Sequence, residues 1–161
     1  MTIKPIEQDK PLDKIDRRIL RELQADGRLS NTALSRLINL SPTPCAERVK
    51  SLERRGLIAG YTARLNPHLL GLELLVFVEI NLARTSPDVF DEFRQAVIKL
   101  PQVLECHLVS GNFDYLIKAR VADMVAYRRL LGETILTLPG VSGSRTYVVM
   151  EEVKESNRLA I

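Results

Sequence analysis

Apolar residues recur at helical spacing over residues 12–23 and predict an amphipathic helix. Asp13 is placed to cap the start of this helix, and Gly27 lies just past its end. A second, shorter helix is predicted to open at Ser30 and to stop near Asn39. The inward-facing residues of the two helices are Leu12, Ile15, Ile19, Leu20 and Leu23, then Ala33, Leu34, Leu37 and Ile38.

A third helix is predicted within the stretch SPTPCAERVKSLERRG, residues 41–56. With Ser41 as N-cap, Pro42 and Pro44 fall in the first turn, where backbone amides have no intrahelical acceptor. The prolines therefore mark a sharp helix start, and Gly56 marks the end. The side chains predicted to be buried on this helix are Cys45, Val49 and Leu52.

The next segment, LIAGYTARLNP, alternates loosely and is predicted to form a short two-stranded hairpin. Three helices followed by a hairpin are typical of a winged helix-turn-helix. On its third helix, cationic side chains suit phosphates and short polar side chains suit base edges. The alternative is the solvated face of a three-helix domain. The candidate DNA-contacting residues are Ser41, Thr43, Glu47, Arg48, Lys50, Ser51, Arg54 and Arg55.

After Pro67 the apolar residues alternate with a period of about two, which predicts a long half-buried strand over 74–82. A helix is predicted to start at Ser86-Pro87, and Asp123 is predicted to cap another helix that carries Leu138. The remaining predicted strands cover 103–110, 115–121 and about 145–153.

Both predicted helices of this half end in similar words, Leu-Pro-Gln-Val and Leu-Pro-Gly-Val, each followed by a strand. This weak repeat indicates a ferredoxin-like βαββαβ domain, so the fold class is α+β with an N-terminal winged helix-turn-helix. Two helices on one face of the sheet leave the other face for self-association, which predicts at least a dimer. The expected layout is an arm at 1–11, the DNA-binding domain at 12–66, a linker at 67–73, the βαββαβ domain at 74–153 and a tail at 154–161.

Composition and charge narrow the class of protein. The chain is 45% hydrophobic and 27% charged, as in globular proteins, and no apolar run is long enough to span a membrane. The N-terminus lacks the apolar core of a signal peptide, which predicts a cytoplasmic protein. Residues 1–66 hold 13 Lys/Arg against 8 Asp/Glu, net +5, whereas residues 67–161 hold 10 against 12, net −2. This asymmetry favours a polyanion as partner of the first half.

No catalytic or metal-binding constellation is visible in the sequence. Cys45 and Cys106 are the two cysteines, and their number and spacing give neither a disulfide framework nor a zinc site. Cys106 and His107 are neighbours in a predicted strand, so their side chains point to opposite faces. We expect no enzyme activity, no cofactor and no metal.

The turn Gly111-Asn112-Phe113-Asp114 is a candidate binding site for a free amino acid. Its backbone amides suit a carboxylate, and Asp114 suits an ammonium group. The alternative is an ordinary turn, in which Gly, Asn and Asp are all favoured.

The chain resembles the Lrp/AsnC, or feast/famine, family of transcriptional regulators. The resemblance rests on LDKIDRRILRELQADGR, LSPTPCAERVKSLERRGLI, LLVFVEI, ECHLVSGNFDYL and TYVVMEEVKES, which lie between Leu12 and about Arg158. It implies that the helix within 41–55 reads double-stranded DNA. It also implies dimers that assemble further, often to octamers, and an amino acid effector bound between dimers.

The effector-binding residues implied by this resemblance lie around the hairpin and in two later segments. Close relatives often carry an acidic residue at the position of Asn112, so the identity of the effector stays open between leucine and a similar amino acid. The implied residues are Leu108, Gly111, Asn112, Asp114, Met124, Tyr147, Val148 and Val149.

Two other functional classes stay open from the sequence. One is an enzyme, or the amino-acid-sensing regulatory subunit of one, which the basic third helix does not favour. The other is a low-specificity architectural protein of the nucleoid, which would share the basic helix but not a preferred operator. The resemblance favours a cytoplasmic, nucleoid-associated regulator.

Overall fold

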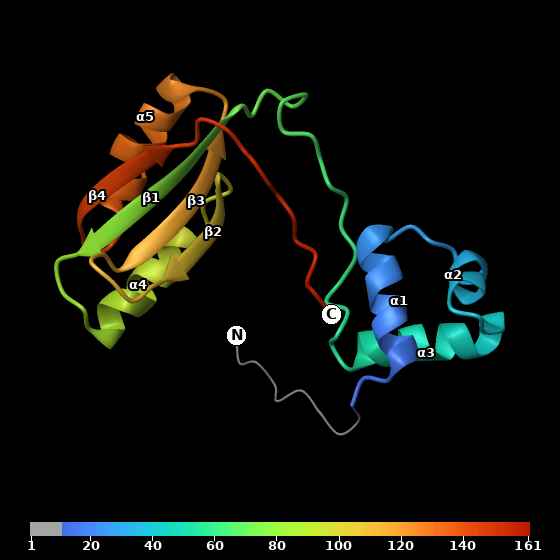
Figure 1. The fold of residues 1–161 in the computed structure, drawn as a ribbon. Coiled ribbons are helices and arrows are strands. Elements are labelled where there is room, and N and C mark those ends of the chain that lie inside the picture. Colours follow the sequence, from blue (N-terminus) through green and yellow to red (C-terminus); the bar gives the residue numbers. More distant parts are fainter. Residues whose placement is uncertain (1–10) are drawn as a thin grey trace. The chain divides into compact units, whose positions relative to one another are not determined.

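The computed structural model describes residues 11–161, so the predicted arm lies outside the described residues except for Pro11. The described chain divides into two compact units (Figure 1). One contains the described residues up to Arg64 together with Glu155–Ile161, and the other contains Leu65–Lys154. The chain therefore passes from one unit to the other twice.

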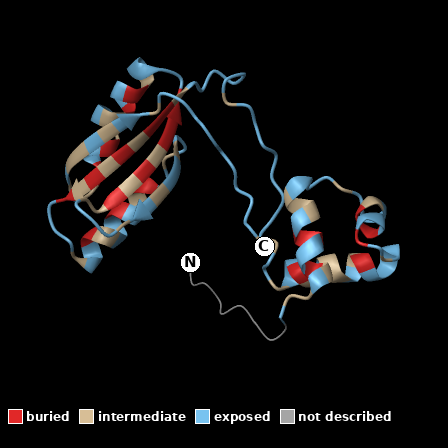
Figure 2. Ribbon diagram, viewed as in Figure 1, coloured by how far each residue is buried: buried red, intermediate tan, exposed pale blue. Residues whose placement is uncertain are grey.

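The first unit is a three-helix bundle of α1 (Lys14–Ala25), α2 (Asn31–Leu37) and α3 (Pro42–Arg54). Asp13 caps α1 by accepting the Asp16 amide at 2.7 Å, and Ser30 caps α2 through the Ala33 amide at 3.1 Å. Apolar side chains of all three helices form one buried cluster, and Figure 2 shows buried positions in red on each of the three helices. Its buried members are Ile19, Leu20, Leu34, Ile38, Cys45 and Leu52.

Two helices of this unit end in the same hydrogen-bonded turn. After α2, Asn39 has φ 56° and the Leu40 amide donates to the Ser35 carbonyl at 2.9 Å. After α3, Gly56 has φ 73° and the Leu57 amide donates to the Leu52 carbonyl at 2.9 Å. Both are Schellman turns, in which a left-handed residue lets the chain leave the helix while its last carbonyls stay paired. The predicted stops at Asn39 and Gly56 are confirmed.

The predicted hairpin after α3 is wrong. Residues 57–66 contain no strand in the structure. The Leu57 and Ile58 amides both donate to Leu52 in the α3 cap, so the segment begins by closing the helix. Without a third strand or a helix to pack on, a two-stranded hairpin of this length is marginal. The chain instead runs on as an irregular linker.

The second unit is a four-stranded antiparallel sheet in the order β2-β3-β1-β4 (Figure 1). This is the predicted ferredoxin-like βαββαβ arrangement. The central strand β1 pairs with β3 and β4, and its bounds match the predicted 74–82. The strands are β1 (Leu74–Leu82), β2 (Val103–Leu108), β3 (Tyr115–Val121) and β4 (Val141–Val148), and the helices are α4 (Pro87–Val97) and α5 (Met124–Glu133).

The last part of this unit differs from the prediction. The strand expected at about 145–153 begins at Val141 and ends at Val148, and Leu138 follows a 3₁₀ turn, Ile135–Thr137, instead of lying in α5. Gly140, with φ 76°, turns the chain sharply so that pairing with β1 starts at Leu82 opposite Val141. A Cβ at Gly140 would stand 2.4 Å from a Val89 methyl carbon, so a side chain has no room there. The Pro-Gly turn, and not the apolar alternation, sets where the strand begins.

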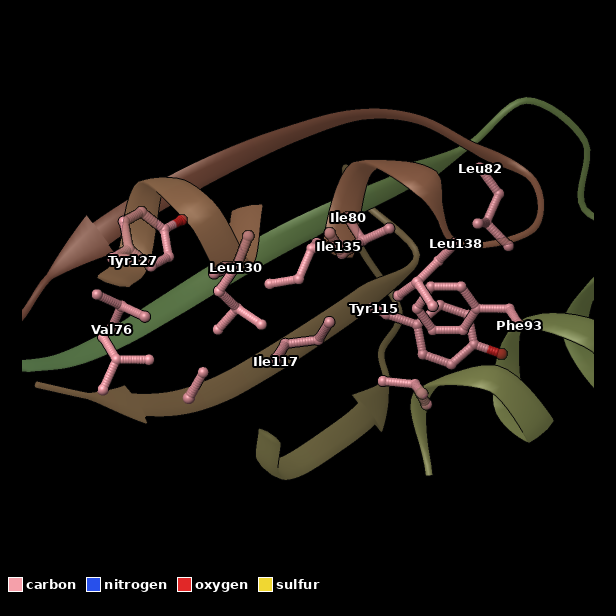
Figure 3. Close-up of a cluster of buried hydrophobic side chains, with 14 of the residues drawn as sticks. Val76, Ile80, Leu82, Phe93, Tyr115, Ile117, Tyr127, Leu130, Ile135 and Leu138 are labelled. Atoms are coloured by element: carbon pink, nitrogen blue, oxygen red, sulfur yellow. The ribbon is translucent and has the colours of Figure 1, made fainter. Parts of the chain in front are cut away.

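Both α4 and α5 cover one face of the sheet. Alternate residues of β1 and β3 point into this core, including Val76, Ile80 and Ile117, and meet Phe93 of α4 and Tyr127 of α5 (Figure 3). Tyr115 at the start of β3 stacks on Phe93 with ring centroids 4.4 Å apart. The predicted placement of both helices on the same face is confirmed.

The other face of the sheet carries apolar and charged side chains together. Leu75, Phe77 and Leu116 lie there among charged side chains, because these residues share the register opposite to the core-facing ones. Lys118 of β3 pairs with Glu105 of β2 at 2.9 Å on this face. In the described part of the chain, the helices are too short and too polar to cross a membrane.

Candidate DNA-binding helix and effector-binding hairpin

The exposed face of α3 carries the predicted DNA-contacting side chains. Thr43, Glu47, Lys50 and Arg54 are exposed, while Ser51 and Arg55 are partly exposed on the side toward α1. The opposite face is anchored by Cys45 and Leu52, which are at most 1% exposed, and by partly buried Val49. Helical periodicity alone predicted this division.

Ser41 occupies the N-cap position of α3 but its side chain makes no capping hydrogen bond. An N-cap hydroxyl normally accepts from the second or third helical amide. The third helical residue is Pro44, which has no N–H, so one of the two usual donors is missing, and the other, the Thr43 amide, makes no such bond. The start of α3 is therefore defined by Pro42 and Pro44, and the predicted cap is correct in position only.

A shallow concavity of about 530 Å³ lies along α3 on the side that faces α1. It combines polar residues suited to base edges with two arginines, and an acidic residue of α1 closes one side. Lys50 and Arg54 do not line it and flank α3 on its outer side. The lining residues are Asp16, Thr43, Pro44, Glu47, Arg48, Ser51, Leu52 and Arg55.

Arg48 differs from the other predicted contacts because it is engaged within the unit. Its guanidinium lies 2.7 Å from a carboxylate oxygen of Asp13 and 2.7 Å from one of Asp16. The Asp16 side chain is 7% exposed and that of Arg48 is 31% exposed. The Asp16 backbone amide, followed by Arg48, lowers the pKa of the Asp13 carboxyl. Arg48 therefore ties α3 to the capping box at the start of α1.

Sequence reasoning missed this ion-pair cluster. The Asp13-x-x-Asp16 spacing is a signal for a capping box, and the structure contains that box. The pairing with Arg48 joins positions 32 and 35 residues apart, which no local pattern reports. The sequence offered one hint of this pairing: Arg48 lies on the flank of α3 and not in the middle of its exposed face.

The predicted effector-binding hairpin is tied firmly to the sheet. The Val109 amide donates to the Asp114 carbonyl at 3.0 Å, and the Asp114 amide donates to Ile80 of β1 at 2.9 Å. An Asp114 carboxylate oxygen also accepts the Leu82 amide at 2.7 Å, beside the irregularity in β1 pairing at Asn81. Asp114 thus has a structural role in addition to any ligand role.

The structure does not bring all predicted effector-binding residues together within one chain. The hairpin residues lie at one end of the strands, where Ile80 pairs with Tyr115. Val149 lies at the opposite end, where its amide donates to Leu75. Asn81, beside the hairpin, and Leu75 are six residues apart along β1, which is roughly 20 Å at about 3.3 Å per residue. One group contains Leu108, Gly111, Asn112 and Asp114, and the other contains Met124, Tyr147, Val148 and Val149.

Both groups present apolar side chains to solvent. Leu108 is 56% exposed, Met124 is 50% exposed and Tyr147 is 45% exposed. The Tyr147 hydroxyl donates to Glu79 at 2.9 Å, which fixes the ring over the open face of the sheet. Exposed apolar side chains at both ends of the strands suit contacts between copies of the chain.

The cysteines and histidines do not form a reactive site among the described residues. Cys45 is fully buried in the first core, and burial raises the pKa of the Cys106 thiol to about 11. His107 lies 3.1 Å from Glu105 on the open face of the sheet. No group of three or more metal-ligating side chains occurs in the part of the chain that the structure describes.

Two family descriptions match the chain, one for each unit. "Lrp/AsnC ligand binding domain" matches residues 75–159, and "Winged helix-turn-helix DNA-binding" matches residues 12–59. The leucine-responsive regulatory proteins of Escherichia coli K12, Salmonella typhimurium and Klebsiella pneumoniae are each 68% identical over 152 residues. The match covers 94% of this chain and 93% of each relative.

Solved structures agree with these matches. A transcriptional regulator of Neisseria meningitidis in complex with L-methionine is 37% identical, with a TM-score of 0.89 over 93% of this chain and 97% of that one. An AsnC family regulator of Agrobacterium tumefaciens is 32% identical, with a TM-score of 0.88 over 92% and 97%. These relatives are regulators of transcription and not enzymes. The helix-turn-helix unit, the ligand-binding fold and the relatives together place the chain in the Lrp/AsnC family of transcriptional regulators.

Proposed function

We propose that the chain is a sequence-specific transcriptional regulator of amino acid metabolism genes, with DNA affinity and assembly tuned by a free amino acid. The observation that carries this proposal is the polar and cationic face of α3, presented by a helix whose other face is core. The same chain holds a domain that matches the Lrp/AsnC ligand-binding description. DNA-binding and sensing parts in one chain suit a linkage between effector and operator.

In the proposed DNA complex, α3 lies in the major groove of double-stranded DNA. Thr43, Glu47 and Ser51 reach base edges from the concavity beside α1. Lys50, Arg54 and Arg55 contact phosphates, and Ser41 offers its hydroxyl at the start of the helix. Arg48 holds the angle between α3 and α1 through Asp13 and Asp16 and is assigned no phosphate contact.

The proposed effector is leucine or an amino acid of similar apolar size. Relatives 68% identical to this chain are named leucine-responsive, and the Neisseria regulator was solved with L-methionine. Because the predicted effector residues lie at opposite ends of the strands of the sheet, the site is completed between two subunits. One subunit supplies the hairpin with Leu108, Gly111, Asn112 and Asp114, and another supplies Met124 and Tyr147–Val149.

The proposed assembly is a homodimer that associates further, with an octamer as the expected size. The open face of the sheet, where Phe77 and Leu116 are partly exposed, supports the first association. The exposed apolar residues at the ends of the strands support the further association of dimers. The proposed location is the cytoplasm, in association with the nucleoid.

The test measures DNA binding and effector linkage together. Fluorescence anisotropy with DNA from the region upstream of the chain's own gene is compared with shuffled DNA of the same composition, with and without each of the twenty amino acids. We expect preference for the upstream DNA and an affinity change with leucine or a similar amino acid. Equal affinity for both DNAs would favour the architectural alternative, and turnover of an amino acid would revive the enzyme alternative.

A further inference from the structure

The last residues of the chain belong to the DNA-binding unit and not to the sheet that precedes them. Glu155–Ile161 groups with the residues up to Arg64, although β4 ends at Val148 in the other unit. The segment contains no helix or strand, so its position depends on specific contacts. Those contacts are concentrated on the second half of α1.

Gln24 of α1 binds the backbone of the tail in both directions. Its amide oxygen accepts the Leu159 N–H at 2.6 Å, and its amide nitrogen donates to the Leu159 carbonyl at 3.2 Å. A side-chain amide that pairs with both polar groups of one residue fixes the register of an extended peptide. The contact selects one position along the tail.

Two arginines complete the contact from opposite sides. Arg21 of α1 donates to the Ile161 carbonyl at 2.5 Å. Arg158 of the tail donates to the Ala25 carbonyl at 3.3 Å, in the last turn of α1. Carbonyls in this turn lack intrahelical donors, and a cation there is favoured by the helix dipole.

The two ends of the tail are also held. Glu155 lies 3.0 Å from Arg64, which belongs to the same unit. The Ile161 side chain is partly buried and packs against the apolar cluster of the three helices. The tail thus has polar contacts along its length and an apolar anchor at its end.

The stretch between the sheet and the tail is short and fixed at its start. Arg120 of β3 pairs with Glu152 and also donates to the Leu72 carbonyl at 3.2 Å. Only Val153 and Lys154 separate this anchor from Glu155. The tail therefore follows this anchor in the sheet unit after two residues of the chain.

We propose that Glu155–Ile161 is a docking segment that completes the DNA-binding unit on the surface of α1 and conveys the effector state of β4 to that helix. From α1 the change reaches α3 through Asp13, Asp16 and Arg48. The docking stands on the contacts above, whereas the conveyed signal rests on the proposed function, in which Tyr147–Val149 contacts the effector.

The docking is tested by hydrogen exchange of α1 amides, without DNA or amino acid. Three variants are compared with the parent: a chain that stops after Lys154, and two chains of parental length that carry Arg21→Met with Gln24→Ala, or Arg17→Met as a control. Arg17 is an exposed arginine of the same helix. We expect the first two variants to exchange at least several-fold faster over α1 and the control to match the parent. Unchanged exchange in both variants would overturn the docking.

The signal is tested by the factor through which leucine, or the amino acid that gives the largest effect, changes DNA affinity. In the Arg21→Met/Gln24→Ala variant we expect effector affinity to be retained and this factor to fall toward one. A full factor in that variant, despite faster α1 exchange, would overturn the conveyed signal. If no amino acid changes the DNA affinity of the parent, the proposed function fails and the signal fails with it, while the exchange measurement still decides the docking.

Discussion

Arg48 has the charge expected of a DNA contact, but its neighbours are those of a residue that stabilises the fold. It is an arginine of the DNA-facing helix, yet its guanidinium contacts two carboxylates of the α1 capping box. Removal of one partner from a poorly solvated ion pair leaves the other charge uncompensated. Loss of the Arg48 side chain should therefore lower the stability of the fold more than it weakens phosphate binding.

A comparison of two arginine variants separates these roles. Arg54→Ala is expected to weaken DNA binding and to reduce the slope of log affinity against log salt by ~0.9, as for one lost phosphate contact. Arg48→Met is expected to leave this slope unchanged and to lower the melting temperature, because Asp16 stays buried without its cation. Anisotropy at several salt concentrations and calorimetry check both. A reduced slope in Arg48→Met would return that residue to the DNA contacts.

The Asp13 carboxyl makes stability depend on pH in a defined direction. Its pKa is lowered from 3.8 in the folded chain, first by the Asp16 amide and then by Arg48. The stabilisation is therefore complete above pH 3.8 and is lost as the pH falls through the lower folded pKa. Asp13→Asn keeps a cap acceptor but cannot titrate, so its melting temperature should fall less steeply below pH 3.8. Parallel acid titrations of parent and variant would contradict this origin.

At the scale of elements, local patterns predicted most starts and ends of helices. The prolines at two helix starts, the Ser and Asp caps and the left-handed Asn39 and Gly56 are all local signals, and each coincides with an element boundary. β4 was misplaced because the apolar alternation near Tyr147 continues past the last paired residue, Val148. Strand ends depend on the partner strand, which a local pattern does not report.

Two serines at helix starts provide a matched test of capping. Ser30 accepts the Ala33 amide at 3.1 Å, whereas Ser41 makes no capping hydrogen bond and Pro44, the third residue of its helix, has no N–H. Ser30→Ala is expected to lower the free energy of unfolding by ~1 kcal/mol, and Ser41→Ala by less than about 0.5 kcal/mol. Urea denaturation of both variants checks the difference. Equal losses would show that Ser41 caps α3 after all.

At the scale of the whole molecule, the candidate effector site is where sequence reasoning reached its limit. The predicted residues lie in the segment that matches the Lrp/AsnC ligand binding domain, but the sequence could not show that they divide between opposite ends of the strands of one sheet. Periodicity gives the face on which a residue lies, and only the strand register gives its level along the sheet. The register puts Asp114 and Val149 roughly 20 Å apart, at about 3.3 Å per residue.

Mixed assemblies test whether two subunits complete the site. Asp114→Asn removes a charge, while the new amide oxygen can still accept the Leu82 amide. Tyr147→Ala removes the exposed ring at the other end of the strands. Each variant alone is expected to lose effector binding. After co-refolding in equal amounts, about a quarter of the sites should combine two intact halves if subunits pair at random. Calorimetry counts these sites, and a mixture that binds no more than its components would place the site within one subunit.

The double passage between the units has a consequence for cleavage of the chain. Because the DNA-binding unit contains both ends of the described chain, a protease cut in the linker after Arg64 does not release it as a single fragment. The three helices would stay attached to the carboxyl-terminal fragment through Glu155–Ile161, held by the Gln24, Arg21 and Arg158 hydrogen bonds. A nicked chain of this kind is a two-piece protein, in which the carboxyl-terminal fragment keeps the other piece in place.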